Sequence, residues 1–326
     1  MHRYSVGMPI PVILDVDTGV DDALALLVAA RHPGLDLLGV SCVAGNVSLD
    51  RVVENTLRVL AAAGRTDVPV AAGARRPLIE AARAATVHGT DGLGGVALDP
   101  SPRQVEPDHA VEFLRRTILA SPEPVTLVAL APQTNIALLL RTHPEVVDRI
   151  ERLVFMGGSA SVGNATAVAE FNVWHDPEAA AIVLDSGVPA YMYGLDVFNA
   201  VAVAQDHAAR LASGDDPLGR VVGALLGNRV SSAHGGEPEY SGLIGDAGAV
   251  CSIVDPDALG TRLLPVHVEL AGYARGQTLV DLRTRPGEDL VHGLSVEWTP
   301  VEVALTVDAP RLVRVFLESI GLASAS

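Results

Sequence analysis

The chain has 326 residues, and its 39 acidic against 23 basic side chains give a formal net charge of −16. All 23 basic residues are arginine, which excludes chemistry that needs a lysine amine, namely a side-chain Schiff base, a P-loop lysine or a kinase-type strand lysine. The acidic surplus also argues against nucleic-acid and anionic membrane partners, because both bind concentrated basic surfaces.

Apolar, β-rich segments alternate with helical patterns through the first two thirds of the chain. Strands that are apolar throughout and separated by helices indicate a parallel sheet covered on both faces. The predicted fold class is therefore α/β, with an open, mostly parallel, doubly wound (Rossmann-like) sheet. The predicted strands are 12–16, 35–43, 68–72, 125–130, 153–156 and 190–193, and the predicted helices are 21–30, 49–63, 177–186 and one that starts at Thr134.

The pattern changes from about residue 263. Segments 266–270, 277–281 and 302–307 show the polar alternation of antiparallel strands, and an amphipathic helix is predicted over 309–320. We therefore expect a small antiparallel addition to the sheet near the C-terminus. Because no linker or internal repeat divides the chain, we expect residues 1–326 to form a single domain.

The sequence also bears on the compartment. No apolar run approaches the roughly 18–20 residues that span a bilayer, and the N-terminal segment lacks the features of a signal peptide. The two cysteines, Cys42 and Cys251, have no metal-ligand spacing, so we predict that both are reduced and lie in the core; a disulfide between them is the alternative. We expect a cytoplasmic protein.

Four carboxylates lie within eight residues where the first predicted strand meets its helix. Asp15 and Asp17 share one face of the strand, and Asp21 and Asp22 open the helix after a turn that Gly19 is expected to permit. Helix capping explains one or two aspartates there, but not four. Like charges this close need a counter-ion, and oxygen ligands suit a hard cation, so the cluster predicts Ca²⁺ or Mg²⁺. Since the acids would repel a phosphate, a neutral ligand with chelating hydroxyls is expected.

The segment from Asp15 to Asp22 resembles the signature of the inosine–uridine-type nucleoside hydrolases. Further matches follow in the family's order, so the resemblance covers about residues 10–255. They are 43–47, 87–94, 131–135, 156–158, 163–164, 169–172, 176–179 and Asp246. The resemblance implies a Ca²⁺-dependent enzyme that hydrolyses the N-glycosidic bond of ribonucleosides to free base and ribose, with a homodimer or homotetramer expected.

The resemblance also implies roles for individual residues. The metal ligands would be Asp17, Asp22, Asp246 and the backbone carbonyl of Leu130, and Asp17 would also be the general base that activates the metal-bound water. Negative charge near the sugar and a poised water suit the oxocarbenium-like state of glycosidic cleavage. Asp15 would support the metal site, and the substrate contacts would be Asp21, Asn46, Met156, Asn164, Glu170, Phe171, Asn172 and Asp246.

One position departs from the family. Many members carry a histidine immediately before the last aspartate, placed to protonate the leaving base, and this chain has Gly245 there. The candidate replacements are His88, His234, Tyr240 and Arg229. Of these, His88 and His234 are the catalytic residues that we predict beside Asp17.

Two other functions fit parts of the sequence. A haloacid-dehalogenase-like phosphatase also places Asp-x-Asp after an apolar strand, although Gly19 and the absence of lysine argue against it. A catalytically weakened nucleoside- or ribose-binding relative would keep the metal site and lack the leaving-group acid. The products separate the three, because only a nucleoside hydrolase releases ribose and leaves nucleotides uncut.

Overall fold

The computed structural model describes residues 8–85, 87–230, 237, 239–294 and 297–322. The strands of the main sheet are β1 (Ile10–Val16), β2 (Leu35–Cys42), β3 (Val70–Ala72), β4 (Val125–Ala129), β5 (Ile150–Met156), β6 (Ala190–Tyr193), β9 (Leu259–Val268), β10 (Thr278–Val280) and β11 (Thr299–Val307). They lie in the order β10-β9-β11-β6-β5-β4-β1-β2-β3, and a small separate sheet pairs β7 (Arg229–Val230) with β8 (Glu239–Tyr240).

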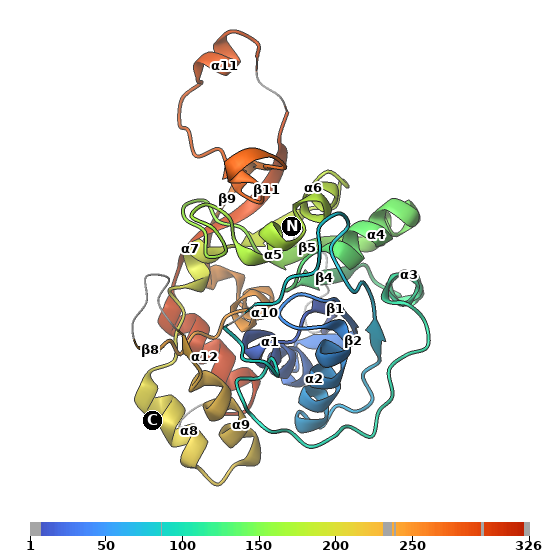
Figure 1. Ribbon diagram of the computed structural model, residues 1–326, viewed down its shortest axis with the longest axis vertical. Helices are drawn as coiled ribbons and strands as arrows, with labels where there is room; N and C mark the ends of the chain where they lie inside the picture. The colour runs from blue at the N-terminus through green and yellow to red at the C-terminus, as the bar shows by residue number, and fades with distance from the viewer. Residues whose placement is uncertain (1–7, 86, 231–236, 238, 295–296, 323–326) are drawn as a thin grey trace.

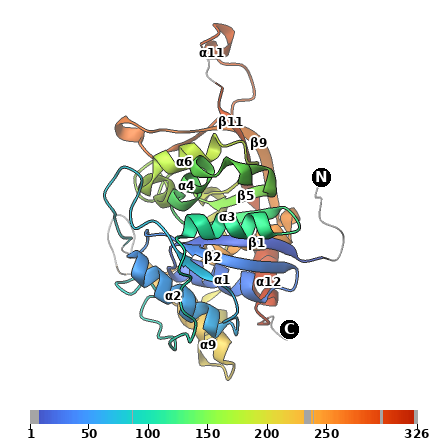
Figure 2. The same ribbon diagram turned by 90° about the vertical axis from the view of Figure 1, so that its right-hand side faces the viewer.

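The helices surround this sheet (Figures 1 and 2). They are α1 (Val20–Arg31), α2 (Leu49–Ala62), α3 (Ala110–Ala120), α4 (Thr134–Thr142), α5 (Phe171–His175), α6 (Pro177–Leu184), α7 (Leu195–Phe198), α8 (Gln205–Ser213), α9 (Pro217–Leu226), α10 (Ala247–Val254), α11 (Glu288–Val291) and α12 (Ala309–Ser319). Three 3-10 helices are η1 (Pro144–Arg149), η2 (Pro256–Ala258) and η3 (Gly272–Ala274).

Both faces of the sheet are buried under helices. Alternation along β1 sends Val12 and Leu14 into a core shared with α1, α2, α10 and α12, and sends Ile13 into a second core shared with α3, α4 and α6. Helix α1 is buried on nearly all sides, as its almost continuous apolar sequence predicts. The predicted α/β class with a doubly wound sheet is confirmed.

The C-terminal strands differ in direction from the others. The strands from β3 across to β6 pair in parallel, and β11 joins β6 in parallel but pairs antiparallel with β9, which in turn pairs antiparallel with β10. The expected antiparallel addition is therefore present. Strand β9 begins at Leu259 instead of residue 266, because its first half pairs with the end of β11, where Leu259 lies opposite Val307.

Two further observations concern membranes and cysteines. Within the described part of the chain, no helix has the length and apolar character that crossing a membrane requires. Cys42 and Cys251 are both buried and free, so the prediction of two unpaired core thiols is confirmed.

Candidate active site

The predicted site residues lie along the carboxyl ends of neighbouring parallel strands. Asp17 follows β1, Asn46 follows β2, Leu130 follows β4 and Met156 ends β5. In an open α/β sheet these ends meet at one edge, and ligands bind there. The sheet order β5-β4-β1-β2 brings all four strand ends side by side, so one site can draw residues from each of them.

The turn from β1 into α1 is held by a side chain. Both carboxylate oxygens of Asp22 accept backbone N–H groups, from Gly19 at 2.9 Å and from Asp17 at 3.2 Å. Gly19 lies in this turn as expected, but its φ of −95° suits any residue, so the turn does not depend on the backbone freedom of glycine. A Cβ on Gly19 would instead lie 2.8 Å from Asn46 Nδ2 and 2.9 Å from His88 Nδ1, so the glycine is there for close approach.

Asp17 is oriented by the loop after β2. Its Oδ2 accepts the backbone N–H of Asn46 at 2.7 Å, and its Oδ1 accepts from Asn46 Nδ2 at 3.1 Å. A Cβ on Gly45 would overlap Asp17 Oδ2, so this glycine lets the loop backbone reach the carboxylate. Asn46 Nδ2 also donates to Asp22 Oδ2 at 3.2 Å. One amide therefore ties the two aspartates of the turn together.

Three carboxylates converge at this edge of the sheet. Single oxygens of Asp21, Asp22 and Asp246 lie within 4.8 Å of one another, with Asp246 at the start of α10. Asp22 and Asp246 are buried, and the arginine ion pairs among the described residues all involve other acids. Buried carboxylates that form no ion pair with a described arginine fit an oxygen-ligated divalent cation.

The electrostatics of the cluster support the same conclusion. Burial raises the pKa of Asp22 to about 7, and the Asp21 charge adds to the rise. Burial and neighbouring carboxylates also hold the pKa values of Asp17 and Asp246 well above their usual range. A bound cation favours the charged form of each acid, so it would reverse these shifts.

Asp15 is buried within β1, two residues before Asp17. Its Oδ1 accepts from Ser41 Oγ at 2.5 Å and from Asn135 Nδ2 at 2.8 Å, while its buried Oδ2 has no hydrogen-bond partner. Burial raises the pKa of Asp15 to about 7. Its side-chain hydrogen bonds among the described residues go to Ser41 and Asn135 and not to the cluster, which agrees with a supporting position.

His88 reaches the cluster from the 88–95 loop. Its Nδ1 accepts the backbone N–H of Val20 at 3.3 Å and lies 3.7 Å from Asp21 Oδ1. Because Nδ1 is used as an acceptor, the neutral ring carries its proton on Nε2. The side chain is 11% exposed, so His88 is a nearly buried N–H donor at the rim of the site.

The opposite wall is built around α5. Glu170 caps this helix and accepts three backbone N–H groups, from Asn172 at 2.9 Å, Gly158 at 3.0 Å and Val173 at 3.2 Å. Burial raises the pKa of Glu170 to about 7 despite these bonds. Asn164 Oδ1 accepts the backbone N–H of Phe171 at 2.9 Å, which fastens the 157–170 loop to the start of the helix.

Asn172 links this wall to the strand ends. Its Nδ2 donates to the carbonyls of Leu130 at 3.0 Å and Met156 at 3.1 Å. The Leu130 carbonyl, one of the predicted metal ligands, therefore lies within reach of the α5 wall.

Comparisons with known proteins agree on one family. A sequence model of the inosine-uridine preferring nucleoside hydrolases matches residues 12–314. The chain belongs to this family. The pyrimidine-specific ribonucleoside hydrolase RihA of Citrobacter koseri is 40% identical over 277 residues, which are 84% of this chain and 89% of that protein. The chain is therefore a ribonucleoside hydrolase, an enzyme that cleaves N-glycosidic bonds.

Solved structures show the same relation. The plant nucleoside hydrolase PpNRh1 matches with a TM-score of 0.84 and 29% identity, over 96% of this chain and 99% of its own. The purine-preferring ribonucleoside hydrolase from Gardnerella vaginalis also has a TM-score of 0.84, with 30% identity over 97% of this chain and 100% of its own. The predicted resemblance to the nucleoside hydrolases is confirmed across nearly the whole chain.

In this nucleoside hydrolase, the candidates for the leaving-group acid differ in their surroundings. His234 lies outside the described residues. The Tyr240 hydroxyl donates to the Val203 carbonyl at 2.7 Å, so its proton is already engaged. Arg229 lies in β7. His88 lies beside the cluster, with its Nδ1 3.7 Å from Asp21 Oδ1.

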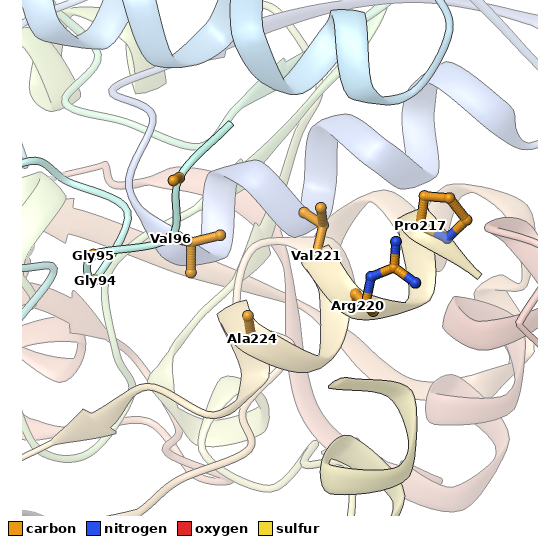
Figure 3. A pocket seen from close by; sticks show the side chains of 8 residues that line it. Gly94, Gly95, Val96, Pro217, Arg220, Val221 and Ala224 are labelled. Carbon is orange, nitrogen blue, oxygen red and sulfur yellow. The ribbon is translucent and has the colours of Figure 1, made fainter. Parts of the chain in front are cut away.

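A surface hollow of about 610 Å³ lies between the segment after the 88–95 loop and α9 (Figure 3). It is lined by residues 94–97 and by Pro217, Arg220, Val221 and Ala224 of α9. None of the predicted site residues lines it, and it contains no carboxylate. The carboxyl edge of the sheet therefore remains the candidate active site of the hydrolase.

Sequence reasoning missed the residues that support the aspartates. Ser41 lies directly opposite Asp15 in the pairing of β1 with β2, and Asn135 opens α4 inside a matched motif. Both donate to Asp15, as described above. Only the strand register identifies Ser41, whereas the 131–135 motif pointed to Asn135 without indicating its partner.

Proposed function

We propose that this protein is a Ca²⁺-dependent ribonucleoside hydrolase with Asp17 as general base. The observation that carries the proposal is the convergence of Asp21, Asp22 and Asp246 at the carboxyl edge of the sheet, with no arginine in an ion pair to them among the described residues. Carboxylates and a backbone carbonyl are the ligands that Ca²⁺ prefers. The proposed ligands are Asp17, Asp22, Asp246 and the carbonyl of Leu130.

Asp17 is oriented for proton transfer before any substrate binds. Asn46 holds both of its oxygens, so the carboxylate is fixed at the end of β1. When bound, Ca²⁺ would lower the pKa of a coordinated water and orient the hydroxyls of the sugar. Asp17 would then accept a proton over a short distance, which a positioned carboxylate does efficiently.

The sugar would lie between the cluster and the α5 wall. We assign its 2′- and 3′-hydroxyls to Asp21 and Asn172, and Asn46 a place near the water and the ribose. The 5′-hydroxyl is assigned to Asn164 and Glu170. Met156 and Phe171 would pack against the sugar, and the surrounding carboxylates would stabilise the positive charge that develops on it.

The leaving base would be protonated by His88. Its Nδ1 accepts from the Val20 N–H, which leaves the Nε2–H free to donate. A general acid is needed most for bases that leave poorly as anions. His234 remains the second candidate for this role.

We expect pyrimidine ribonucleosides to be hydrolysed, because the relatives at 40% identity are named pyrimidine-specific. The test is a panel of purine, pyrimidine and nicotinamide ribosides assayed for reducing sugar, with nucleotides as controls. Ribose from at least one riboside and uncut nucleotides would support the proposal. Phosphate release from nucleotides would indicate a phosphatase, and tight binding without ribose formation would indicate a binding protein.

The proposal also includes the oligomeric state of the protein. A homodimer or homotetramer is supported by the exposed apolar side chains Leu263, Tyr273, Leu290, Val291 and Leu294. The last three lie on or next to α11, which projects from the body in both views (Figures 1 and 2). Light scattering in solution tests this assembly.

The sheet that joins both halves of the chain supports one domain over residues 1–326, and the free cysteines support a cytoplasmic location.

A further inference from the structure

Gly245 touches Asp21 across the site. It directly precedes Asp246 at the start of α10 and has a φ of +54°, in the left-handed region that favours glycine. A Cβ built on Gly245 would overlap the Cβ of Asp21 and lie 3.2 Å from its Oδ2. The backbone that leads into Asp246 therefore rests directly against the first turn of α1.

Neither side of this contact is free to move. On one side, the Ile244 N–H donates to the Val201 carbonyl at 3.1 Å, and the Gly248 N–H donates to the Gly245 carbonyl at 2.9 Å. On the other side, Asp21 belongs to a helix whose next residue, Asp22, is fixed by two backbone N–H groups. A side chain at position 245 must therefore separate the start of α10 from the start of α1.

We infer that Gly245 is a positioning residue whose missing side chain sets the distance of Asp246 from Asp21 and Asp22. The three carboxylates come from two different elements, and their oxygens meet within 4.8 Å only because α10 approaches α1 this closely. A β-carbon at position 245 opens that spacing and weakens the grip on a divalent cation. The inference deepens the proposed function and rests on it, since it takes the cluster to be the Ca²⁺ site.

The same contact concerns the position at which the chain departs from the family pattern. A histidine at position 245 would bring a Cβ into the space that Asp21 occupies in this chain. Gly245 therefore does more than remove the expected leaving-group acid. The carboxylate cluster can pack this closely because position 245 has no side chain. Restoring the histidine by G245H is expected to weaken metal binding instead of improving catalysis.

Two properties of the glycine must be separated by the variants. G245A adds a Cβ and also strains the left-handed backbone, whereas G245N adds a Cβ on a residue that tolerates that backbone. The matched control is G64A, because Gly64 has a φ of +75° and no atom within 4 Å of a built Cβ. G64A therefore reports the backbone strain without the contact.

The experiment titrates Ca²⁺ into chelator-treated, full-length protein by calorimetry and records Tm in chelator. We expect G245A and G245N to bind Ca²⁺ about tenfold more weakly or worse, as supporting residues of metal sites typically do when changed. G64A should bind as the wild type does. The Tm of G245A in chelator should fall somewhat further than that of G64A, because the overlap with Asp21 adds to the backbone strain, but both variants should remain folded.

Several results would overturn the inference. Wild-type Ca²⁺ affinity in G245N alone would show that the glycine is needed only for its backbone angle. Wild-type affinity in both variants would show that the contact with Asp21 does not affect Ca²⁺ binding. Loss of the fold by both variants in chelator would show a general packing role for the α1–α10 contact. The proposed function is tested separately, since a wild type that binds Ca²⁺ and releases ribose beside unaffected variants refutes only the inference.

Discussion

Two sets of acids in this chain differ in their partners. On the surface, arginines bind Asp50, Asp67 and Asp281, and the hydrogen bonds from Arg283 lower the pKa of Asp281 to about 2. In the site, burial raises the pKa of Asp22 to about 7. These surface acids have an arginine as counter-ion, whereas no arginine in the described part of the chain forms an ion pair with Asp22. Acids paired with arginine therefore add nothing to the net charge of −16, whereas the site acids belong to the unpaired surplus, which a bound cation would partly balance.

Among changes to the two sets of acids, removal of the general base is expected to have the largest effect on activity. Asp17→Asn keeps the size of the side chain and an acceptor oxygen for Asn46, but it removes the ability to accept a proton. We expect kcat for ribose release to fall by about 10³-fold, within the range of general acid–base catalysis. Asp50→Asn is the control on the surface set, and it should leave kcat unchanged. A Asp17→Asn enzyme with wild-type turnover would contradict the assigned role.

The next largest effect is expected from His88, the proposed leaving-group acid. His88→Gln retains an N–H donor but cannot carry the proton to the base, so kcat for uridine is expected to fall by about 10²-fold. Turnover of p-nitrophenyl riboside, whose leaving group needs no proton, should change little. Equal losses on both substrates would show that His88 acts on the site's structure and not as an acid.

The pH dependence of stability follows from the buried set. Burial raises the pKa values of Asp15, Asp22 and Glu170 to about 7, while unfolded carboxyls titrate near pH ~4. Between these values the folded protein holds more protons than the unfolded chain, so the free energy of unfolding falls as pH rises from about 4 to about 7. We expect the Tm in chelator to fall between pH 5 and pH 8, and excess Ca²⁺ to reduce that fall.

A matched variant isolates one member of this set. Asp15→Asn keeps the Oδ1 acceptor for Ser41 and Asn135 but cannot ionise. Its Tm in chelator should therefore exceed that of the wild type at pH 8 and differ less at pH 5. A metal-free wild type that is more stable at pH 8 than at pH 5 would be inconsistent with the buried set as described.

The smallest effect is expected from the paired surface set. Asp50 and Arg75 form a 2.8 Å ion pair in which both side chains are mostly exposed. Exposed pairs contribute little, because water and salt screen them. The double variant Asp50→Asn, Arg75→Gln should keep the wild-type Tm and Ca²⁺ affinity. A clear loss of Ca²⁺ affinity would show that the surface charges are coupled to the site.

The sequence predicted the parallel half of the fold better than the C-terminal half. The apolar strands and the helix beginning at Thr134 were placed within a few residues, because both faces of that sheet are buried and the pattern is unambiguous. Strand β9 was placed several residues late, since half of its residues face solvent. Helix α10 went unpredicted, because its small residues follow a glycine-rich stretch that looks like a loop.

The site was predictable in its residues but not in its contacts. The spacing of Asp15, Asp17, Asp21 and Asp22 on the strand and helix pointed to one acidic cluster. The structure groups Asp21 with Asp22 and Asp246, and ties Asp17 to Asn46. Contacts between segments more than 200 residues apart, such as Gly245 against Asp21, depend on how α10 packs on α1, and no local pattern in the sequence encodes that packing.

We propose that the buried site carboxylates hold a Ca²⁺ ion and that ribose release depends on this ion. The most direct test adds Ca²⁺ stepwise to chelator-treated enzyme with uridine or the best riboside of the panel, and follows reducing sugar. We expect no turnover in chelator and full recovery as Ca²⁺ saturates the protein. Undiminished ribose release in chelator, from protein shown to be free of metal, would contradict it.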